Sequence, residues 1–409
     1  MRIVQPFVCP KLPANKTNTA LAPQPNSAGV WIATMALYRV GGAVRDLLLG
    51  RKPADYDFAF DGSTAQFIAS HAGARVVGKT VRVCLWQGQE YMPLIGGSLA
   101  ADLASRDLTI NALALEDNGV LHAHPQALHD LAQRILRPAS ATALQDDPAR
   151  VFRLARFAAC LPEFTLDATA IFQMRALAHS AALCALPAER IGREVLKALH
   201  APAPSRFLTT LAAGGLLQPP AQDHASTGWF YELYHCDTIP AGPVPWHKGS
   251  VLAHTGRVMD ACAGDSLAVW MALCHDIGKM HTPADHLPHH YQHEKIGQAY
   301  ALSLGQRLGL PKKYIHAGEL AARLHMKAGM YECLRIGTRR DLLWQVHCAG
   351  MSQPFWRMVD ADSKKQHSVR ALADEQRICA ITLPAAWQNQ GAASGRHLRE
   401  LQCLALSRR

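Results

Sequence analysis

The stretch YRVGGAVRDLLLGRKPADYDFAF, residues 38–60, constrains the fold most, because it joins two predicted strands through a glycine turn and a helix. LYRV is typical of a strand, and DYDFAF alternates with the period of two expected of a half-buried strand. Since residues two apart point to the same face of a strand, Asp55 and Asp57 are expected to project together. The aromatic side chains of DYDFAF are then expected to face the core.

The same stretch carries the groups of a phosphate site. Two parallel carboxylates repel each other unless a cation lies between them, and Mg²⁺ prefers oxygen ligands. Gly41 and Gly42 allow backbone N–H groups to approach an anion before a helix, and Arg45 lies one turn into that helix. A plain turn or solvent-facing aspartates also explain either half alone, whereas the combination favours metal-dependent phosphoryl chemistry.

Further patterns extend this region into a mixed sheet. AQFIASHAG predicts a helix, ARVVG a strand, VRVCLWQGQEYMPLI a hairpin, and EDNGVLHA contains an Asn-Gly turn. From DDPARVFRLARFAA onward the pattern is helical, with a break where prolines and glycines cluster at 237–250. The fold class is therefore α+β. We expect a mixed-sheet head at 35–145, a helical neck and body at 146–240, a helical domain at 250–350 and closing helices at 351–409.

Composition limits the setting of this fold. Residues 1–34 are rich in Pro, Asn and Thr and are expected to be disordered and dispensable, with Met35 a candidate start. No apolar run reaches the roughly 18–20 residues of a membrane-spanning helix. The 11 cysteines include no Cys-x-x-Cys pair, so a reducing cytoplasm is expected. The net charge of +10 suits a polyanion such as nucleic acid, although many basic proteins bind none.

A second cluster of charge lies in DDPARVFRLARF. Arg150, Arg153 and Arg156 recur at a spacing of three, which places them on one broad helix face. Asp147 and Pro148 match the residue types favoured at a helix N-cap and first position. On this evidence alone the segment is a capped amphipathic helix with a basic face.

Histidines gather in the later helical region. The segments VLAHTGRVMD, LCHDIGK, HHYQHEKIG and ARLHMKAG contain His254, His275, Asp276, His290, His293 and His325. Single histidines on helices are usually structural, but a His-Asp doublet with histidines before and after it is rarer. Imidazole and carboxylate groups together suit a divalent transition metal that activates water against a phosphoester.

Four motifs in order give the chain a family resemblance. GGAVRDLLLG with DYD, then SRDLTINALAL, DDPARVFRLARF and LPAERIGREVLKAL, resemble the class II nucleotidyltransferases, which include bacterial CCA-adding enzymes and poly(A) polymerases. The resemblance implies that Asp55 and Asp57 hold catalytic Mg²⁺. It also implies that Gly42 and Arg45 bind the incoming nucleotide, and Glu90 falls where the family places a third acidic residue.

The resemblance further implies a template made of protein. Asp147 and Arg150 match a motif whose carboxylate and guanidinium pair with the base of CTP or ATP. Arg can donate to cytosine O2 and N3, and Asp can accept from the exocyclic amine. Contacts to the nucleotide phosphates are then expected from Arg106, Arg153 and Arg156.

The histidine-rich segment resembles the HD phosphohydrolase domain. Its place after a nucleotidyltransferase is that of the multifunctional CCA proteins, which carry phosphatase, 2′-nucleotidase and 2′,3′-cyclic phosphodiesterase activities. By this likeness His254, His275 and Asp276 are metal ligands for a divalent transition metal such as Ni²⁺. The expected partners are tRNA, CTP and ATP, with no membrane, and the chain is a monomer or a homodimer.

Three positions depart from the family. Ser105 precedes Arg106 where the family usually has a further arginine, and the segment from Glu90 to Asp102 is short. The family has a flexible loop there that is associated with the switch from CTP to ATP, so the short segment predicts that the terminal A is added poorly or not at all. His347-Cys348 stands where the family commonly has Asp-Ala, so no late acidic group is expected near the HD site.

The function expected from this resemblance is CCA addition to tRNA 3′ ends together with HD phosphohydrolysis. Three alternatives stay open. A CC-adding enzyme would stop before A, and the short segment favours it. A poly(A) polymerase would extend RNA with ATP alone, which the HD domain argues against. An RNA-binding protein with a degenerate head would retain only the HD chemistry, against which the motif residues are intact.

Overall fold

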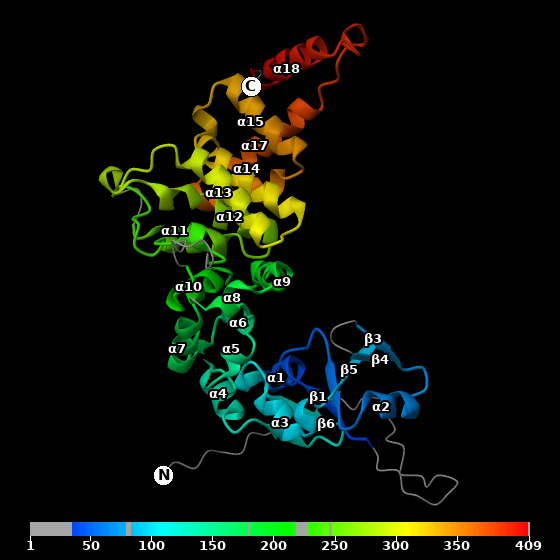
Figure 1. Ribbon diagram of the computed structural model, residues 1–409. Helices are drawn as coiled ribbons and strands as arrows, with labels where there is room; N and C mark the ends of the chain where they lie inside the picture. Colours follow the sequence, from blue (N-terminus) through cyan, green and yellow to red (C-terminus); the bar gives the residue numbers. More distant parts are fainter. Residues whose placement is uncertain (1–34, 79–82, 179, 218–227, 245–247, 408–409) are drawn as a thin grey trace, which may run out of the picture. The chain divides into compact units, whose positions relative to one another are not determined.

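The computed structural model describes residues 35–78, 83–178, 180–217, 228–244 and 248–407 (Figure 1). The chain divides into two compact units, with the boundary between Ala143 and Leu144. The predicted α+β class, with a mixed-sheet head followed by helices, is confirmed. The expected disordered segment, residues 1–34, lies outside the described residues. Within those residues, no helix has the length and apolar character needed to cross a membrane.

The described part of the first unit contains a seven-stranded mixed sheet. Its strand order is β3-β4-β5-β2-β1-β6-β7, and of its neighbouring pairs β2 and β5 run parallel while the others are antiparallel. The strands are β1 (Leu37–Val40), β2 (Asp57–Phe60), β3 (Arg75–Val77), β4 (Val83–Trp86), β5 (Gln89–Pro93), β6 (Leu113–Glu116) and β7 (Leu121–Ala123). Two short strands, β8 (Ile135–Leu136) and β9 (Thr165–Leu166), lie outside this sheet.

Apolar side chains bury both faces of this sheet. On one face Ala59 packs in a cluster with Val40 and Leu103, and on the other Phe60 packs with Phe67 and its neighbours. The helices of this unit are α1 (Gly42–Leu48), α2 (Thr64–Ser70), α3 (Leu99–Ala104) and α4 (Ala127–Gln133), with 3-10 turns at Ile95–Gly97 and Thr109–Asn111. The central strands are therefore covered by side chains on both sides rather than on one.

The prediction for DYDFAF is wrong in two respects. Strand β2 begins at Asp57, so Asp55 and Tyr56 precede it and are exposed. The physical reason is that β1 ends at Val40, the residue opposite Asp57, where the chain turns at Gly41. Beyond that point β1 offers no backbone partner, and Tyr56 does not enter the core.

The predicted turns are confirmed. Strands β4 and β5 form an antiparallel hairpin whose turn residues Gln87 and Gly88 have φ of 49° and 77°. Positive φ at both central residues matches the right-handed twist of a two-residue hairpin. At the Asn-Gly turn, the N–H of Glu116 donates to the carbonyl of Val120 over 2.9 Å, which closes the β6–β7 connection.

The second unit is helical. Helix α5 (Ala143–Asp146) spans the boundary, and 3-10 turns occur at Tyr231–Leu233, Ile277–His281, Ala284–His286, Tyr331–Cys333 and Ala385–Trp387. The remaining helices are α6 (Arg150–Cys160), α7 (Ala168–Leu177), α8 (Ala181–Cys184), α9 (Ala188–Leu199), α10 (Ser205–Ala213), α11 (Val251–Ala261), α12 (Ser266–Cys274), α13 (His293–Arg307), α14 (Lys312–Ala328), α15 (Ile336–Cys348), α16 (Ser352–Ser363), α17 (His367–Cys379) and α18 (Ala392–Ser407).

Helix α12 is the centre of this unit. All its residues after Ser266 are buried, and it packs against α11, α14 and α16. A helix that is apolar on every side is stable only when other elements enclose it. His275 and Asp276 directly follow its last residue, so the HD doublet lies at the end of the most enclosed helix.

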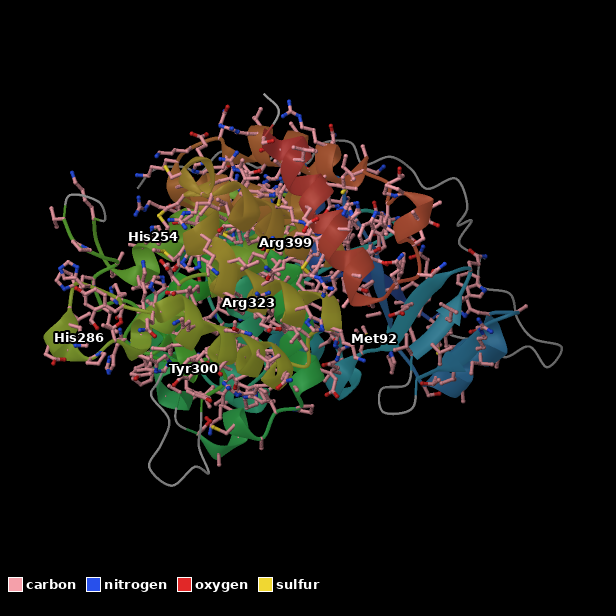
Figure 2. All side chains as sticks on the ribbon, turned by 90° about the horizontal axis from the view of Figure 1, so that it is seen from above. Met92, His254, His286, Tyr300, Arg323 and Arg399 are labelled. Atoms are coloured by element: carbon pink, nitrogen blue, oxygen red, sulfur yellow. The ribbon has the colours of Figure 1, made fainter. Side chains whose placement is uncertain are left out.

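Figure 2 shows the side chains, with Tyr300 labelled in the helical unit. The ring of His281 stacks on that of Tyr300, with centroids 3.5 Å apart and planes 3° from parallel. The Nε2 atom of His281 is buried and has no hydrogen-bond partner among the described residues. Burial lowers the pKa of His281 to about 4.

We expect the free energy of unfolding to fall on acidification because of His281. The unfolded chain protonates this residue near its ordinary pKa of about 6.5, whereas the folded state resists protonation until about 4. The contribution is therefore complete above pH 6.5 and is lost as pH falls toward 4, on the order of 1 kcal/mol after allowance for solvent screening. Denaturant titrations between pH 7 and 4 should show a shallower fall for His281→Phe, and an unchanged slope would contradict this.

Candidate functional site

The head carboxylates lie at the end of three neighbouring strands. In register, Asp57 is opposite Val40 of β1 and beside Glu90 of β5. Residues paired in this way project to the same face of a sheet, so the Asp57 and Glu90 carboxylates are neighbours. Asp55 precedes the strand and is exposed. In the part of the chain that the structure describes, these three carboxylates do not come within the 4.8 Å of one another that defines a three-ligand cluster.

The glycine turn directly follows β1 at these strand ends, and two arginine side chains lie against it. Gly41 has φ of 73°, and a Cβ atom built there would lie 3.5 Å from Nη1 of Arg106. A Cβ atom on Gly42 would lie 3.5 Å from Nη2 of Arg45. Both guanidinium groups therefore lie against the backbone of the turn, at a distance where a Cβ atom on either glycine would make ordinary van der Waals contact with them.

Arg45 is held in place by residues of the SRDLTIN motif and by its own helix. The side chain is only 8% exposed, and its Nη1 donates to Oδ1 of Asn111 over 2.7 Å. Asn111 in turn donates to Asp107 over 3.0 Å, and Asp46 lies 2.7 Å from Arg45 Nη2. Sequence reasoning missed Asn111, although it lies inside a quoted motif, because no charge marked it.

Arg106 is fixed by a buried carboxylate. Its Nε and Nη2 atoms donate to Oδ2 of Asp102 over 3.0 and 2.6 Å, and Asp102 is 2% exposed. Oδ1 of Asp102 accepts the backbone N–H of Ile95 over 3.2 Å. The short segment after β5 is therefore joined through Asp102 to the arginine at the glycine turn.

In the helical unit, the predicted template residue Asp147 pairs with a residue that sequence reasoning missed. Its two carboxylate oxygens lie 3.0 and 2.7 Å from Nη2 of Arg190 on α9. The prediction that Asp147 caps α6 is wrong, because the helix begins at Arg150 with Ala149 as its cap residue. Pro148 and Ala149 instead form a turn, in which Asp147 accepts the N–H of Ala149 over 3.2 Å.

Two arginines of α6 converge on one acidic residue. Nε of Arg156 lies 2.5 Å from Oε2 of Glu194, and Nη1 of Arg153 lies 3.7 Å from Oε1 of the same carboxylate. Glu194 is 7% exposed and belongs to α9, in the quoted motif LPAERIGREVLKAL. Any phosphate that binds these arginines has to share them with Glu194.

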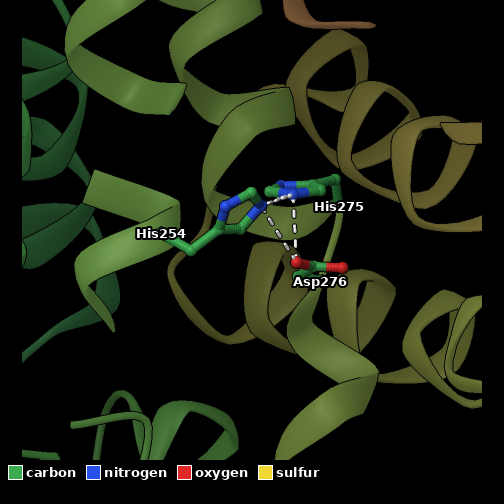
Figure 3. Close-up of side chains that lie close together, drawn as sticks. All are labelled: His254, His275 and Asp276. Atoms are coloured by element: carbon green, nitrogen blue, oxygen red, sulfur yellow. Dashed lines mark hydrogen bonds and ion pairs between the residues drawn. The ribbon is translucent and has the colours of Figure 1, made fainter. Parts of the chain in front are cut away.

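The HD doublet forms a compact ligand group with α11 (Figure 3). Nε2 of His254 lies 3.2 Å from Nε2 of His275 and 3.3 Å from Oδ2 of Asp276. Nε2 of His275 lies 3.2 Å from the same carboxylate oxygen. The three side chains are buried and offer ligand atoms within 4.8 Å of one another. The structure thus brings together the three residues that the resemblance to the HD domain implied as ligands.

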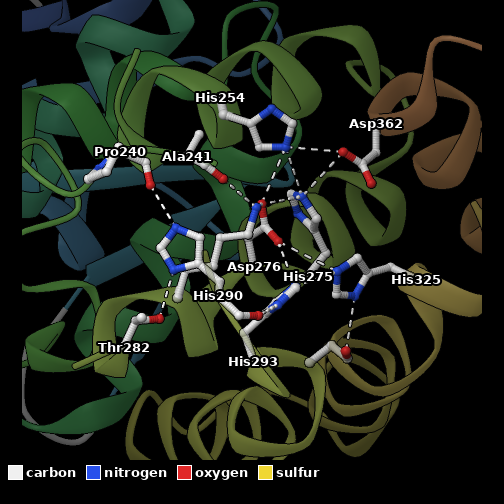
Figure 4. A network of polar contacts seen from close by, with 12 residues as sticks. Pro240, Ala241, His254, His275, Asp276, Thr282, His290, His293, His325 and Asp362 are labelled. Atoms are coloured by element: carbon white, nitrogen blue, oxygen red, sulfur yellow. Dashed lines mark hydrogen bonds and ion pairs between the residues drawn. The ribbon is translucent and has the colours of Figure 1, made fainter. Parts of the chain in front are cut away.

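A late carboxylate completes this group, contrary to expectation. Oδ1 of Asp362, near the end of α16, lies 3.0 Å from Nε2 of His254 and 3.7 Å from Nε2 of His275 (Figure 4). The expectation that no late acidic group contributes was based on His347-Cys348 and is wrong, because α16 rather than the end of α15 reaches the doublet. No local pattern marked Asp362.

A second ligand group shares Asp276. Its other oxygen, Oδ1, lies 3.3 Å from Nε2 of His293 and 3.5 Å from Nε2 of His325. These residues come from α13 and α14, and their Nε2 atoms are 3.1 Å apart. The two groups place histidine nitrogens on both sides of one carboxylate.

Backbone carbonyls set the orientation of the histidine rings. Nδ1 of His275 lies 2.7 Å from the carbonyl oxygen of Ala272, and Nδ1 of His293 lies 2.7 Å from that of His290. Nδ1 of His325 lies 3.0 Å from the carbonyl oxygen of Ala322. A ring nitrogen that faces a carbonyl carries a proton, so Nε2 is the nitrogen of each ring that is left to face the carboxylate and a metal. This arrangement is the one that metal-binding histidines require.

His290 is not part of either group. Its Nδ1 lies 2.7 Å from the Thr282 hydroxyl and its Nε2 lies 2.8 Å from the Pro240 carbonyl, so both ring nitrogens have protein partners. Burial lowers the pKa of His290, which favours the neutral ring. Its role in this structure is to anchor the segment that precedes α13.

The two ligand groups that share Asp276 are together called the Asp276 centre. Its electrostatics favour ionised carboxylates. Burial opposes the charge of Asp362, but His275 and a hydrogen bond from His254 outweigh it and lower the pKa of Asp362 to about 2. The pKa of Asp276 is likewise lowered against burial by His275 and Lys279, whose Nζ lies 2.7 Å from Oδ2. A set of four buried imidazoles, the buried Asp276 and the half-buried Asp362 fits divalent transition metals.

Comparisons with known proteins agree with the fold and show the family of the chain. The "Poly A polymerase head domain" matches residues 37–82, and the "Probable RNA and SrmB- binding site of polymerase A" matches residues 163–225. The multifunctional CCA protein of Pasteurella multocida is 36% identical over 71% of this chain and 74% of its own. That of Aromatoleum aromaticum is 31% identical over 88% and 90%. The chain belongs to the multifunctional CCA protein family.

Solved structures show the same fold at lower identity. The Thermotoga maritima CCA-adding enzyme complexed with tRNA aligns with 90% of this chain and 86% of its own, at a TM-score of 0.60 and 18% identity. An apo CCA-adding enzyme aligns with 92% and 87%, at a TM-score of 0.61 and 16% identity. This chain therefore has the fold of these CCA-adding enzymes over most of its length.

We expect Gly278→Ala to disrupt the second ligand group. A Cβ atom at Gly278 would lie 2.0 Å from the carbonyl oxygen of His293, so α13 would have to move and carry His293 with it. Equilibrium dialysis with Mn²⁺ should show a loss of affinity of about 10–100-fold. Gly395→Ala is the matched control, because its Cβ would meet nothing within 4 Å. Equal affinities in the two variants would contradict this.

Proposed function

We propose that this protein adds C, C and A to tRNA 3′ ends from CTP and ATP without a nucleic-acid template. In each step the 3′-hydroxyl of the tRNA attacks the α-phosphate of the nucleotide, a new phosphodiester forms, and pyrophosphate leaves. Membership of the multifunctional CCA protein family supports this reaction. The basic chain, with a net charge of +10, suits an RNA substrate.

The register of β1, β2 and β5 carries this proposal. It sets Asp57 beside Glu90 on one side and Val40 on the other. Val40 directly precedes the glycine turn. Carboxylates suited to cations, and guanidinium groups suited to phosphate, then lie together at the ends of these central strands. Such an arrangement is suited to a nucleoside triphosphate with its metal.

The roles of the head residues follow from this arrangement. Asp55, Asp57 and Glu90 would hold Mg²⁺, which supplies charge neutralisation of the phosphates and of the departing pyrophosphate when bound. Arg45 and Arg106 would bind phosphate oxygens by charge-assisted hydrogen bonds beside Gly42. Because both arginines are already oriented by neighbouring side chains, little reorganisation is needed when the nucleotide binds.

The helical unit would select the base. Asp147 and Arg150 offer a hydrogen-bond acceptor and donors that can pair with cytosine or adenine edges. Arg190 would orient the Asp147 carboxylate, since it contacts both of its oxygens. Arg153 and Arg156 would contact phosphate, with Glu194 limiting their side-chain freedom.

We also propose a second activity, metal-dependent phosphohydrolysis at the Asp276 centre. The two ligand groups that share Asp276 support it. His254, His275 and Asp276 would hold a divalent transition metal such as Ni²⁺, with Asp362 as a further ligand. When bound, the metal supplies a water nucleophile and polarises a phosphoester. Lys279, beside Asp276, would offset negative charge near the substrate phosphate. The substrates expected are 2′- and 2′,3′-cyclic phosphates and phosphate monoesters.

One observation keeps a CC-adding enzyme as the second candidate. Strand β5 ends at Pro93 and α3 begins at Leu99, so only a short connection containing one 3-10 turn separates them. If the switch from CTP to ATP needs a longer loop there, addition stops after CC.

The first test is to sequence tRNA 3′ ends after incubation with Mg²⁺, CTP and ATP. Transcripts that end before CCA should gain CCA, and those that end in CC should gain A. Asp57→Ala should slow both by about 10³-fold or more, because the metal charge at the reacting phosphate is lost. Asp117→Asn, an exposed carboxylate at the β6–β7 turn, is the matched control and should leave the rate unchanged.

The outcomes of this test are distinct. Products that stop at CC, with no A added to the second transcript, would establish the CC-adding alternative. Extension by A alone on any RNA would indicate a poly(A) polymerase. Wild-type protein that extends neither transcript would contradict nucleotide addition and leave the Asp276 centre as the remaining chemistry.

The two activities should separate by mutation. Asp276→Asn should abolish hydrolysis of 2′,3′-cyclic AMP in the presence of Ni²⁺, because both ligand groups lose their shared carboxylate. CCA addition should persist, which also shows that the variant folds. Asp285→Asn, an exposed carboxylate in the 3-10 turn Ala284–His286, should retain both activities. Hydrolysis that survives Asp276→Asn would contradict this assignment.

A further inference from the structure

A third group of potential metal ligands lies among the C-terminal helices, separate from the Asp276 centre. It consists of His347 on α15 and of Glu375 and Cys379 on α17, which offer ligand atoms within 4.8 Å of one another. Nδ1 of His347 lies 2.7 Å from Oε1 of Glu375, and Sγ of Cys379 lies 3.5 Å from Nε2 of His347. His347 and Cys379 are exposed, so an ion can reach them from solvent.

The carboxylate of Glu375 contains a buried oxygen atom without a hydrogen-bond partner. Although 9% of the residue is exposed, its Oε2 atom is buried and has no hydrogen-bond partner in the part of the chain that the structure describes. Its Oε1 atom accepts from Ser352 over 2.8 Å as well as facing His347. A buried carboxylate oxygen without a partner is costly, and a bound cation would satisfy it.

Two helix ends add to the attraction for a cation. Cys348 is the last residue of α15 and Cys379 is the last residue of α17, and both helices are 13 residues long. The carbonyl groups at a helix C-terminus carry partial negative charge, which favours positive charge nearby. The ligand group therefore lies where two such ends approach each other.

The donor set indicates the class of ion. Thiolate, imidazole and carboxylate together suit Zn²⁺ and related transition metals rather than Mg²⁺ or Ca²⁺. In a tetrahedral zinc site with ordinary bond lengths, a sulfur and a nitrogen ligand lie about 3.6 Å apart. Nδ1 of His347, the nitrogen that faces Glu375, lies 3.6 Å from Sγ of Cys379, which matches this value. The closer His347–Glu375 pair needs to open by only about half an ångström to admit the ion.

We propose that His347, Glu375 and Cys379 form a transition-metal site of the zinc class that fastens the end of α15 to the end of α17. Water would complete the coordination, since the group is open to solvent. Ser352 positions Glu375 for the ion by its hydrogen bond from the start of α16. The site is structural: it holds three of the C-terminal helices together and takes no part in reactions at Asp276 or at the head.

Cobalt binding tests this proposal, because Co²⁺ bound by a thiolate shows a near-ultraviolet sulfur-to-metal charge-transfer band. The ligand groups around Asp276 contain only nitrogen and oxygen, so Co²⁺ there produces no such band. Titration of the full chain with CoCl₂ under reducing conditions should produce the band, and Zn²⁺ should displace it. The band should survive in Asp276→Asn, which keeps this test independent of the proposed hydrolase activity.

Variants identify the ligands. Cys379→Ser should abolish the band, and His347→Ala should weaken Co²⁺ binding by about tenfold or more. Ser352→Ala should retain the band with an affinity reduced by about tenfold, because the Glu375 carboxylate is then less well oriented. Cys333→Ser, an exposed cysteine outside the group, is the matched control and should behave as the wild type.

Two results would overturn the proposal. One is the absence of a charge-transfer band in the wild-type chain at saturating Co²⁺. The other is a band that persists unchanged in Cys379→Ser, which would place the thiolate elsewhere. Far-ultraviolet circular dichroism of each variant shows whether a lost band reflects a lost ligand or a lost fold, and His347→Ala supplies a second variant that leaves every cysteine in place.

Discussion

The buried carboxylate of Asp276 is the interaction on which the helical unit depends. It lies at the end of the fully enclosed helix α12 and faces imidazoles from α11, α13 and α14, while Lys279 lies 2.7 Å from one oxygen. A buried charge is tolerated only where partners surround it. The helices of this unit therefore have to meet around one point, and the same convergence creates the ligand groups.

In the head, the register of the central strands determines where the candidate site residues lie. Strand β1 ends at Val40, so Asp57 is the first residue of β2 that finds a partner, and Glu90 is aligned with it on β5. The glycine turn follows at once, and the guanidinium group of Arg106 lies against it. Backbone hydrogen bonding thus positions acidic and basic groups that would otherwise be scattered.

Local patterns in the sequence predicted the short-range features and failed on the long-range ones. The glycine turn, the β4–β5 hairpin and the His-Asp doublet depend on neighbours in the chain, so they could be predicted. Asp362 and Arg190 come from helices distant in sequence, and no spacing linked them to His254 or Asp147. Period-two alternation showed a strand in DYDFAF but not where its ladder ends, because that is decided by β1.

The most direct test of this account is an anomalous difference map from crystals grown with Mn²⁺ and a non-hydrolysable CTP analogue. We expect metal density between Asp57 and Glu90, with the triphosphate against Arg45 and Arg106, and separate density at Asp276. Density at Asp276 with an ordered nucleotide bound elsewhere, and none at Asp57, would contradict the central claim that the ends of β2 and β5 hold the metal of nucleotide addition.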